Sequence, residues 1–487
     1  MPVYNPAPQV LKEAVESVLN QTYDHWELCM ADGSDSASHF EIKNLLKDYV
    51  RNDYRIKVVF LNKNRGISEN SNKALEVARG EFVALLDHDD QLAPFALYRV
   101  VQRLNEESGL DLLYSDRDLL SDDSKKRYHP FFKPDWSSET LVSVNYLIHL
   151  CVIRKSLVDR VGGFISEMDG AQDWDLFFRV TEHTSEIAHL PEILYHWRVG
   201  PTSAAWSQVA KPYVVKAQFL AVKNHFKRSD IDVEVSRGTS GFIKVKWKFN
   251  NAVRASIILV VQGDIPVLKR SLNSILTKTA YSNYEIILVT HQNMDLSDLE
   301  RISKHNQDLK LVLYSDDFNL SQMKNLGAEK ADGEVFVFLG DQMEILDPDW
   351  LEELLGWVGQ ERVGAAGGKV LNSRGTIWNA GIVINQDNVT YLFSGTKEYF
   401  GKYGSSEWYR NYQAVSGACL AVRKDVFREI GPFDDHPGDD SDNLVFCSKL
   451  QKQGYRIVYS PYARLRFIGN EGNRLILPVS FQGLWTG

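Results

Sequence analysis

The 487-residue sequence has few cysteines, no long apolar run and no long basic run. Its four cysteines lie far apart and form no Cys-x-x-Cys pair, which argues against a disulfide framework or a cysteine zinc site. No apolar stretch approaches the roughly 20 residues that span a membrane. The net charge is -9, so we expect no nucleic-acid partner. The first residues lack a signal-peptide pattern, and we expect a cytoplasmic protein, with peripheral contact at the inner face of the cell membrane left open.

The most informative stretch that is present is a short apolar strand followed by carboxylates. Residues 82–86 are all apolar, which is typical of a strand buried on both faces of a parallel sheet. Asp87, Asp89 and Asp90 follow directly. Ligands of open α/β sheets bind beyond the carboxyl ends of strands, and divalent cations take oxygen ligands and bridge phosphates. The stretch therefore predicts a metal–diphosphate site, with a solvated acidic turn as the structural alternative.

Strand and helix patterns alternate along the first 200 residues. Further strands are expected at 26–31, 57–61 and 110–114, with helices between them. Such alternation predicts a parallel, doubly wound α/β sheet. The strand ends would bring Asp32, Arg65 and Asp87 to one edge. Residues 1–4 read as the tail of a strand, so we expect the chain to begin inside its first strand.

The same pattern returns in the second half of the chain. Residues 274–286 repeat the layout of 17–28, and residues 325–334 repeat 72–81. Internal repeats of this kind predict a duplicated domain. We expect a first domain at 1–205, a linker at 206–254 with an amphipathic helix and a hairpin, a second domain at 255–470 and a tail at 471–487.

Several motifs, in this order, resemble glycosyltransferase family 2. They are Pro2-Val3-Tyr4-Asn5, residues 17–23, Asn64-Arg65-Gly66, Asp87-His88-Asp89-Asp90, Gly162-Gly163-Phe164, Asp173-Trp174-Asp175-Leu176 and Tyr195-His196-Trp197-Arg198. The layout is similar to tandem bacterial members that build surface polysaccharides. The resemblance implies two tandem GT-A domains of the α/β class, each with a mostly parallel doubly wound sheet, and an inverting reaction.

The resemblance also implies a role for each motif residue. Asp173 would be the base that takes a proton from the acceptor hydroxyl; helix N-capping is its structural alternative. The metal, Mn²⁺ or Mg²⁺, would be held by Asp89 and His196, with a diphosphate contact or a packed core position as the alternatives for His196. Acceptor binding would fall to Trp174 and Gly163, although a core tryptophan is an equal alternative. The residues expected to bind the nucleotide-sugar are Pro2, Val3, Tyr4, Asp32, Arg65, Asp87 and His88.

The second copy lacks these residues at the aligned positions. The strand alignment places Gly340 and Gln342 at the positions of Asp87 and Asp89. We expect Asn443 at the position of the base; a one-residue shift in the alignment would instead bring in one of its acidic neighbours, Asp439, Asp440 or Asp442. Neither Asn nor Gln replaces a carboxylate in these roles. We therefore expect the second domain to keep the fold without metal-dependent transfer and to hold a glycan or a partner enzyme. Aromatic residues such as Tyr399, Tyr403, Trp408, Tyr409 and Tyr412 would stack on sugars, with core or rim positions as an equal alternative.

Three functions compete. The leading hypothesis is transfer of a sugar from a nucleotide-diphosphate donor to an oligosaccharide or lipid-linked glycan acceptor, by the first domain. Nucleotidyl transfer also uses a metal–diphosphate site, but it needs a basic phosphate loop near the N-terminus, where residues 1–20 offer only Lys12. The third is a non-catalytic scaffold of two degenerate domains. The four residues Asp87, Asp89, Asp173 and His196 argue against it.

Overall fold

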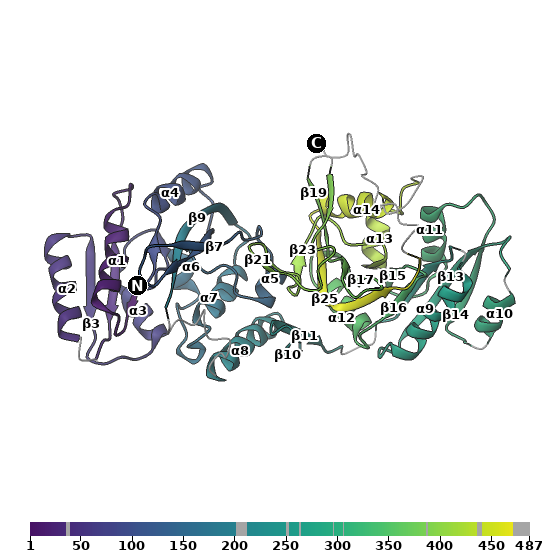
Figure 1. Cartoon of the computed structure of the whole chain (residues 1–487), viewed down its shortest axis with the longest axis horizontal. Coiled ribbons are helices and arrows are strands. Elements are labelled where there is room, and N and C mark those ends of the chain that lie inside the picture. The colour runs from purple at the N-terminus through teal and green to yellow at the C-terminus, as the bar shows by residue number, and fades with distance from the viewer. Residues whose placement is uncertain are drawn as a thin grey trace. The chain divides into compact units, whose positions relative to one another are not determined.

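The computed structural model describes residues 1–35, 39–200, 212–249, 253–262, 264–295, 297–304, 306–385, 388–435 and 441–470. It divides into two compact units (Figure 1). The first comprises Met1–Val235 and Phe400–Gly404, and the second comprises Ser236–Tyr399 and Ser405–Gly487. The tail predicted at 471–487 lies outside the described residues. No helix in the described part of the chain combines the length and apolar character needed to cross a bilayer.

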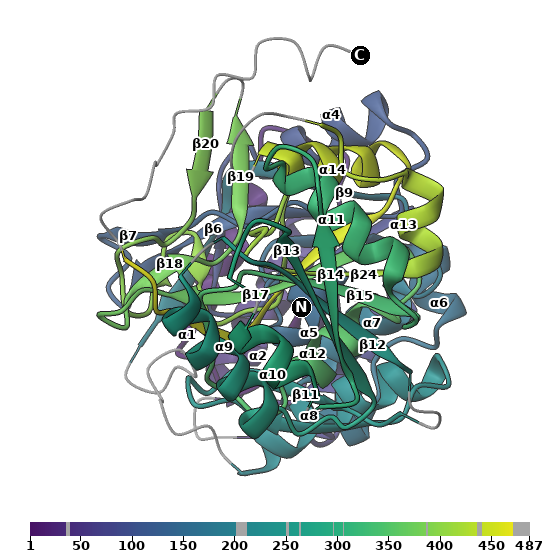
Figure 2. The same ribbon diagram turned by 90° about the vertical axis from the view of Figure 1, so that its right-hand side faces the viewer.

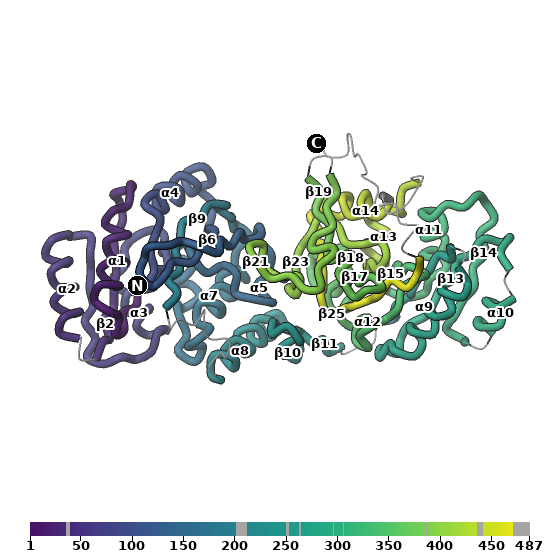
Figure 3. The backbone as a smooth tube through the Cα atoms, in the orientation of Figure 1, coloured from purple at the N-terminus to yellow at the C-terminus, as the bar shows by residue number. Residues whose placement is uncertain are grey.

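The first unit alternates helices and strands along its N-terminal part (Figure 3). Its strands are β1 (Pro2–Val3), β2 (Leu28–Asp32), β3 (Ile56–Phe60), β4 (Phe82–Ala84), β5 (Gln91–Leu92), β6 (Leu112–Ser121), β7 (Arg127–Phe131), β8 (Cys151–Arg154) and β9 (Ile187–Val199). Its helices are α1 (Pro8–Leu19), α2 (His39–Asn52), α3 (Ile67–Val77), α4 (Ala96–Glu106), α5 (Ser138–Ser143), α6 (Lys155–Arg160), α7 (Gln172–Thr181) and α8 (Pro212–Arg228).

These strands form two sheets. β1, β2 and β3 pair in parallel. The other sheet is mixed, with the order β4-β8-β6-β9-β5, and β7 pairs with β6. Helix α1 begins with a proline, whose missing N–H costs nothing in a first turn, and buries Leu11, Val15 and Val18 on one face. The predicted α/β class and most of the expected strands are therefore present.

The second unit contains one large mixed sheet with the strand order β14-β13-β12-β15-β24-β17-β25-β16. Its principal strands are β12 (Ala255–Val260), β13 (Tyr284–His291), β14 (Leu309–Tyr314), β15 (Val335–Leu339), β16 (Met343–Ile345), β17 (Val363–Leu371), β24 (Cys419–Arg423) and β25 (Arg456–Phe467). Its helices are α9 (Ile265–Lys278), α10 (Ser297–Lys304), α11 (Leu320–Lys330), α12 (Trp350–Val358), α13 (Lys424–Ile430) and α14 (Ser441–Lys452). The minor strands are β18 (Ile377–Asn379), β19 (Ile382–Asn385), β20 (Asn388–Tyr391) and β23 (Arg410–Asn411); β19 and β20 run antiparallel (Figure 2).

The segment predicted as a linker divides between the two units. Helix α8 packs on α7 of the first unit, where His225 stacks on Phe178 and its Nδ1 lies 2.6 Å from Glu182 Oε1. The hairpin consists of β10 (Val233–Arg237) and β11 (Ile243–Trp247). In the second unit, Trp247 of β11 packs edge-on against Trp357 of α12. Apolar contact thus assigns the helix to one unit and β11 to the other.

The strand expected at 82–86 differs from its prediction. β4 covers only Phe82–Ala84, and its residues are half-buried or exposed. The repeated strand β15, in contrast, is buried at all five positions. The difference follows from the neighbours, because β15 lies between β12 and β24, whereas β4 pairs only with β8 among the described residues.

Candidate active site

The turn between β4 and β5 carries the three predicted carboxylates, and Asp90 anchors it. Asp90 is 1% exposed. Its carboxylate accepts a hydrogen bond from Tyr195 Oη at 2.5 Å and another from the backbone N–H of Arg198 at 2.7 Å. Burial, with Asp87 and Asp89 nearby, raises the pKa of Asp90 well above its usual value. Asp90 is therefore a structural anchor for the turn.

Arg198 holds the same turn from β9. Its Nε donates to the backbone oxygen of Asp89 at 2.6 Å, and its Nη2 donates to Glu13 Oε2 of α1 at 2.8 Å. The side chain is almost fully buried. A rigid guanidinium with several donors can fix several elements at once. Arg198 therefore positions the carboxylate turn, and its donors face the protein.

Asp87 lies beside His149, a residue that the sequence motifs did not indicate. His149 Nε2 is 3.7 Å from Asp87 Oδ2, and the imidazole stacks on the Tyr195 ring. Burial, followed by nearby Lys133 and Arg117, lowers the pKa of His149 to about 3, so the ring is neutral. A neutral imidazole is the form that binds metals.

A candidate cation site follows from this pair. One ligand atom each from Asp87, Asp90 and His149 lie within 4.8 Å of one another. His149 Nδ1 is buried without a hydrogen-bond partner among the described groups. Because Asp90 is committed to Tyr195 and Arg198, Asp87 and His149 have the freer ligand atoms. Oxygen and imidazole donors fit a divalent cation such as Mn²⁺.

Asp173 is the second residue of α7, and it faces the groove that Asp87 also lines. Its Oδ1 accepts the backbone N–H of Trp174 at 2.8 Å. Burial raises the pKa of Asp173 to about 6, with a further contribution from the negative charge of Asp87. A carboxyl group with this pKa is an effective general base near neutral pH.

Asp32 closes the same edge from β2. It is 1% exposed, and its Oδ1 accepts the backbone N–H of Ser34 at 3.0 Å. Its Oδ2 is buried with no hydrogen-bond partner among the described residues. A buried carboxylate oxygen without a donor is costly, which suits a site where a ligand supplies one.

The remaining predicted donor-binding residues occupy different environments. His88 Nδ1 lies 3.2 Å from the backbone oxygen of Pro2, which joins the carboxylate turn to β1. Val3 is fully buried and Tyr4 is exposed. Arg65 pairs with Glu69 at 2.6 Å on the surface of α3. Among these residues, His88 and Pro2 are joined by a hydrogen bond.

Three predicted site residues are engaged elsewhere. His196 places Nδ1 2.7 Å from Asp118 and Nε2 3.2 Å from Arg127, so both ring nitrogens have protein partners. Trp174 is 4% exposed and donates to the Leu141 oxygen, which matches the core alternative and leaves no free ring face for a sugar. Gly163 has φ +67°, and an added Cβ would lie 2.6 Å from Asn72 Oδ1, so this glycine serves close packing on α3.

In the second unit a buried ion pair occupies the position that corresponds to Asp173. Asn325 exchanges two hydrogen bonds with Phe433, as Asn72 does with Phe164. Counting from each phenylalanine places Asp442 at the position of Asp173, one residue before the expected Asn443. Asp442 accepts from Lys324 Nζ at 2.9 Å and from Ser321, and it is 1% exposed.

The aromatic residues proposed for glycan binding in the second unit are mostly in the core. Trp408, Tyr409 and Tyr412 are 3%, 0% and 8% exposed. Tyr403 is 49% exposed. Trp408, Tyr409 and Tyr412 therefore match the core alternative and not sugar stacking, because they are buried against neighbouring rings such as Trp357 and Tyr459.

A mixed α/β unit with a carboxylate-lined groove near its strand ends is the arrangement expected of a GT-A glycosyltransferase fold. The model of the family described as "Glycosyl transferase family 2" matches residues 1–162 and 256–431. The chain therefore belongs to glycosyltransferase family 2, with one match in each unit.

Similar proteins include an uncharacterized protein, y4gI, of Sinorhizobium fredii, 34% identical over 477 residues. The O-antigen biosynthesis protein RfbC of Myxococcus xanthus is 32% identical over 469 residues. These matches cover 96% and 95% of this chain, but only 52% and 36% of the relatives, so the chain spans about half or less of their length. A solved structure, the mannosyltransferase PcManGT of Pyrobaculum calidifontis in complex with GDP-Man and Mn²⁺, is 14% identical with TM-score 0.35, and covers 46% of this chain and 59% of its own.

Proposed function

We propose that the first unit is an inverting, metal-dependent glycosyltransferase. It moves a sugar from a nucleotide-diphosphate donor to a growing bacterial surface glycan or its lipid-linked precursor, at the cytoplasmic side of the membrane. The observation that carries this proposal is that Asp173, with its pKa raised to about 6, lines the same groove as Asp87. Such transfer needs a base for the acceptor hydroxyl and a carboxylate site that can hold a metal ion for the diphosphate.

Asp173 takes the proton of the acceptor hydroxyl as its oxygen forms a bond to the anomeric carbon of the donor sugar. The bond from that carbon to the diphosphate breaks in the same displacement, which inverts the configuration. The backbone N–H of Trp174 donates to Asp173 Oδ1, and the Asn145 side chain also hydrogen-bonds the carboxylate, so two protein groups fix its orientation. Orientation of the base by a rigid helix start favours this step.

The departing diphosphate is negative, and a bound divalent cation would supply the opposing charge. Asp87 and His149 are proposed to hold Mn²⁺ or Mg²⁺, with Asp89 of the same turn as the further carboxylate that the sequence motif implies. His149 is favoured over His196 because both ring nitrogens of His196 have protein partners, Asp118 and Arg127. The unpaired Asp32 Oδ2 is proposed to accept an N–H of the nucleotide base. Tyr195 and Arg198 keep the turn in place.

The acceptor class rests on the relatives. RfbC is described as an O-antigen biosynthesis protein, and a chondroitin synthase of Escherichia coli is 26% identical over 227 residues. Both names refer to the synthesis of a glycan. The second unit, whose Asp442 is paired with Lys324, is proposed to be non-catalytic and to hold the acceptor or a partner enzyme.

Calorimetric titration of the full chain with UDP, GDP and dTDP, each with and without Mn²⁺, tests the donor site. We expect one nucleotide to bind in a metal-dependent way, and Asp87→Ala to abolish that binding. Asp159→Ala is the control, because Asp159 is an exposed carboxylate paired with Lys155 on α6. Absence of binding by all three nucleotides would favour a non-catalytic scaffold.

A further inference from the structure

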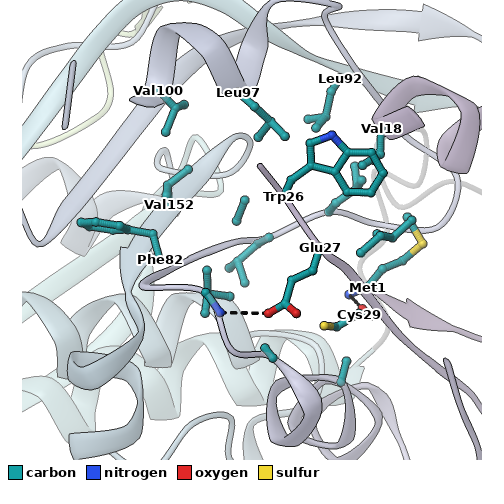
Figure 4. A pocket seen from close by; sticks show the side chains of 18 of the residues that line it. Met1, Val18, Trp26, Glu27, Cys29, Phe82, Leu92, Leu97, Val100 and Val152 are labelled. Atoms are coloured by element: carbon teal, nitrogen blue, oxygen red, sulfur yellow. Dashed lines mark hydrogen bonds between the residues drawn. The ribbon is translucent and has the colours of Figure 1, made fainter. Parts of the chain in front are cut away.

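The walls of the candidate groove that Figure 4 draws are mostly apolar. They include Val18, Phe82, Leu97 and Val100, and Glu27 adds a carboxylate. Neither an apolar side chain nor a carboxylate attracts an anion. A negatively charged substrate group at this site therefore needs positive charge from another part of the first unit.

Arg117 of β6 lies against the groove at Trp197, which is one of the lining residues. The guanidinium carbon Cζ is 4.5 Å from the centroid of the Trp197 ring and 5.3 Å from that of the Phe131 ring. Contact with aromatic faces holds a guanidinium in place without engaging a carboxylate. The two rings therefore fix the position of this cation.

The guanidinium of Arg117 has no paired anion. No hydrogen bond or ion pair joins it to another residue in the described part of the chain, and its Nε is buried without a partner. The carboxylates of Asp90 and Asp118, whose charges act on Arg117, are bonded to Tyr195 and His196. A buried charge without a partner is costly, which suits a site where a ligand supplies the anion.

Arg117 is charged at neutral pH, whereas two basic neighbours are not. Burial lowers the pKa of Arg117 only to about 10. Burial lowers the pKa of Lys133 well below its usual value, and Lys133 Nζ donates to the backbone oxygens of Leu147 and His149 at 3.0 Å. The pKa of His149 is about 3. Arg117 thus retains a positive charge beside two basic groups that have lost theirs.

The second unit provides a comparison for this position of the sheet. The backbone N–H of Leu92 donates to Ser17 Oγ at 3.2 Å, and the backbone N–H of Ile345 donates to Ser274 Oγ at 3.1 Å. Ser17 and Ser274 begin the repeated segments 17–28 and 274–286. Leu92 and Ile345 therefore occupy equivalent strand positions in the two units.

The strand registers continue this equivalence to Arg117. The first of these positions pairs with Tyr195, which pairs with Arg117. The second pairs with Leu465, which pairs with Val370. Val370 is fully buried, so an apolar side chain fills this place in the sheet of the second unit. The arginine thus occurs in the unit that also has the carboxylate turn, and the sheet itself does not require it.

We propose that Arg117 binds an anionic group of a substrate, a phosphate or a carboxylate, at the candidate active site. The forked N–H donors of a guanidinium match both of these anions. The diphosphate of the donor and an anionic group on the acceptor glycan are the two sources of this chemistry. The proposal rests on the proposed function for the identity of the substrates, whereas anion binding by Arg117 is measured without it.

Calorimetric titration of the full chain with inorganic pyrophosphate, in buffer containing Mg²⁺, tests anion binding. We expect Arg117→Gln to bind pyrophosphate on the order of 10- to 100-fold more weakly than the unchanged chain, because a charged hydrogen-bonded pair is lost. Arg117→Lys should lose only part of the affinity, since it keeps the charge without the fork. Arg51→Gln is the control, because Arg51 is an exposed arginine on α2. Equal pyrophosphate binding by Arg117→Gln and the unchanged chain would overturn the proposal.

Chemical denaturation separates anion binding from a structural role of the arginine. Arg117→Met should bind pyrophosphate as weakly as Arg117→Gln, while its free energy of unfolding stays equal or rises, because an apolar side chain suits this place as Val370 does. An Arg117→Met chain that unfolds more easily and still binds pyrophosphate normally would make Arg117 a structural residue and overturn the proposal.

Two further measurements identify the source of the anion. If the source is the donor, Arg117→Gln should weaken nucleotide-diphosphate binding by the same factor as pyrophosphate binding and leave the KM for acceptor unchanged. If the source is the acceptor, nucleotide binding should persist and that KM should rise. No change in either would overturn the assignment to a substrate. Pyrophosphate binding lost in Arg117→Gln, with no nucleotide bound by the unchanged chain, would count against the proposed function and support the anion site.

Discussion

The hydroxyl of Tyr195 donates a 2.5 Å hydrogen bond to Asp90, and it also accepts the backbone N–H of Asp87 at 3.3 Å. One side chain on β9 thereby holds both ends of the turn that presents the predicted cation ligands. The ring also stacks on His149, whose Nε2 lies near Asp87. The geometry of the candidate site therefore depends on a residue that is not itself among the candidate cation ligands.

Tyr195→Phe should lower both stability and nucleotide affinity. Removing the hydroxyl leaves a buried Asp90 oxygen without its donor, which costs about 1–3 kcal/mol. Chemical denaturation and calorimetry measure the two effects. Tyr54→Phe is the control, because Tyr54 is 91% exposed. Unchanged Mn²⁺-dependent nucleotide binding in Tyr195→Phe would show that the turn holds its shape without this bond.

Asp173→Asn should reduce turnover by about 10²- to 10⁴-fold while nucleotide binding persists, since the amide keeps the shape of the side chain but cannot take a proton. The rate is measured with the donor that calorimetry identifies. Asp159→Asn serves as the control carboxylate. Turnover unchanged by Asp173→Asn would remove this residue from the role of base.

The pH dependence of transfer should follow the same carboxyl group. Burial raises the pKa of Asp173 to about 6, so the group is protonated, and inactive as a base, below that pH. kcat/KM should rise with pH through about 6 and level off above it. If the residual activity of Asp173→Asn showed the same acidic limb, the limb would belong to another group.

Substitution of Trp174 separates a core role from acceptor binding. Trp174→Ala should lower the free energy of unfolding by about 3–5 kcal/mol, because it leaves a cavity beneath α7. Trp174→Phe should lose only the bond to the Leu141 oxygen and retain activity. A normal unfolding free energy together with a raised KM for acceptor would contradict the core assignment.

Lys324→Met should destabilise the second unit. The substitution leaves the buried Asp442 carboxylate without its partner, a loss of about 3–5 kcal/mol. Adding Asp442→Asn should restore part of that free energy, because it removes the unpaired charge. Denaturation of the full chain, followed by hydrogen exchange in α11 and α14, measures both. A double variant no more stable than Lys324→Met would contradict the ion-pair explanation.

Periodicity was sufficient to predict the elements that bury one face. The strands β2 and β3 lie within a few residues of the predicted ranges, and the helices α1 and α2 lie between strands as the alternation predicts. Short sequence motifs also indicated Asp87 and Asp173 as site residues, and both line the same groove. The roles of His149 and Tyr195 could not be predicted, because each acquires its partner from a strand far away in the sequence.

The sequence by itself determined the α/β class, the duplication and the family, because apolar spacing and motif order are properties of the chain alone. Tertiary structure decided which groups meet. In the folded chain His196 is hydrogen-bonded to Asp118, Trp174 lies in the core, and Asp442 forms an ion pair with Lys324. It also left β4 half-covered, while the equally apolar β15 is buried. The physical reason is that burial and pairing depend on neighbours from other elements, whose positions follow only from packing of the whole unit.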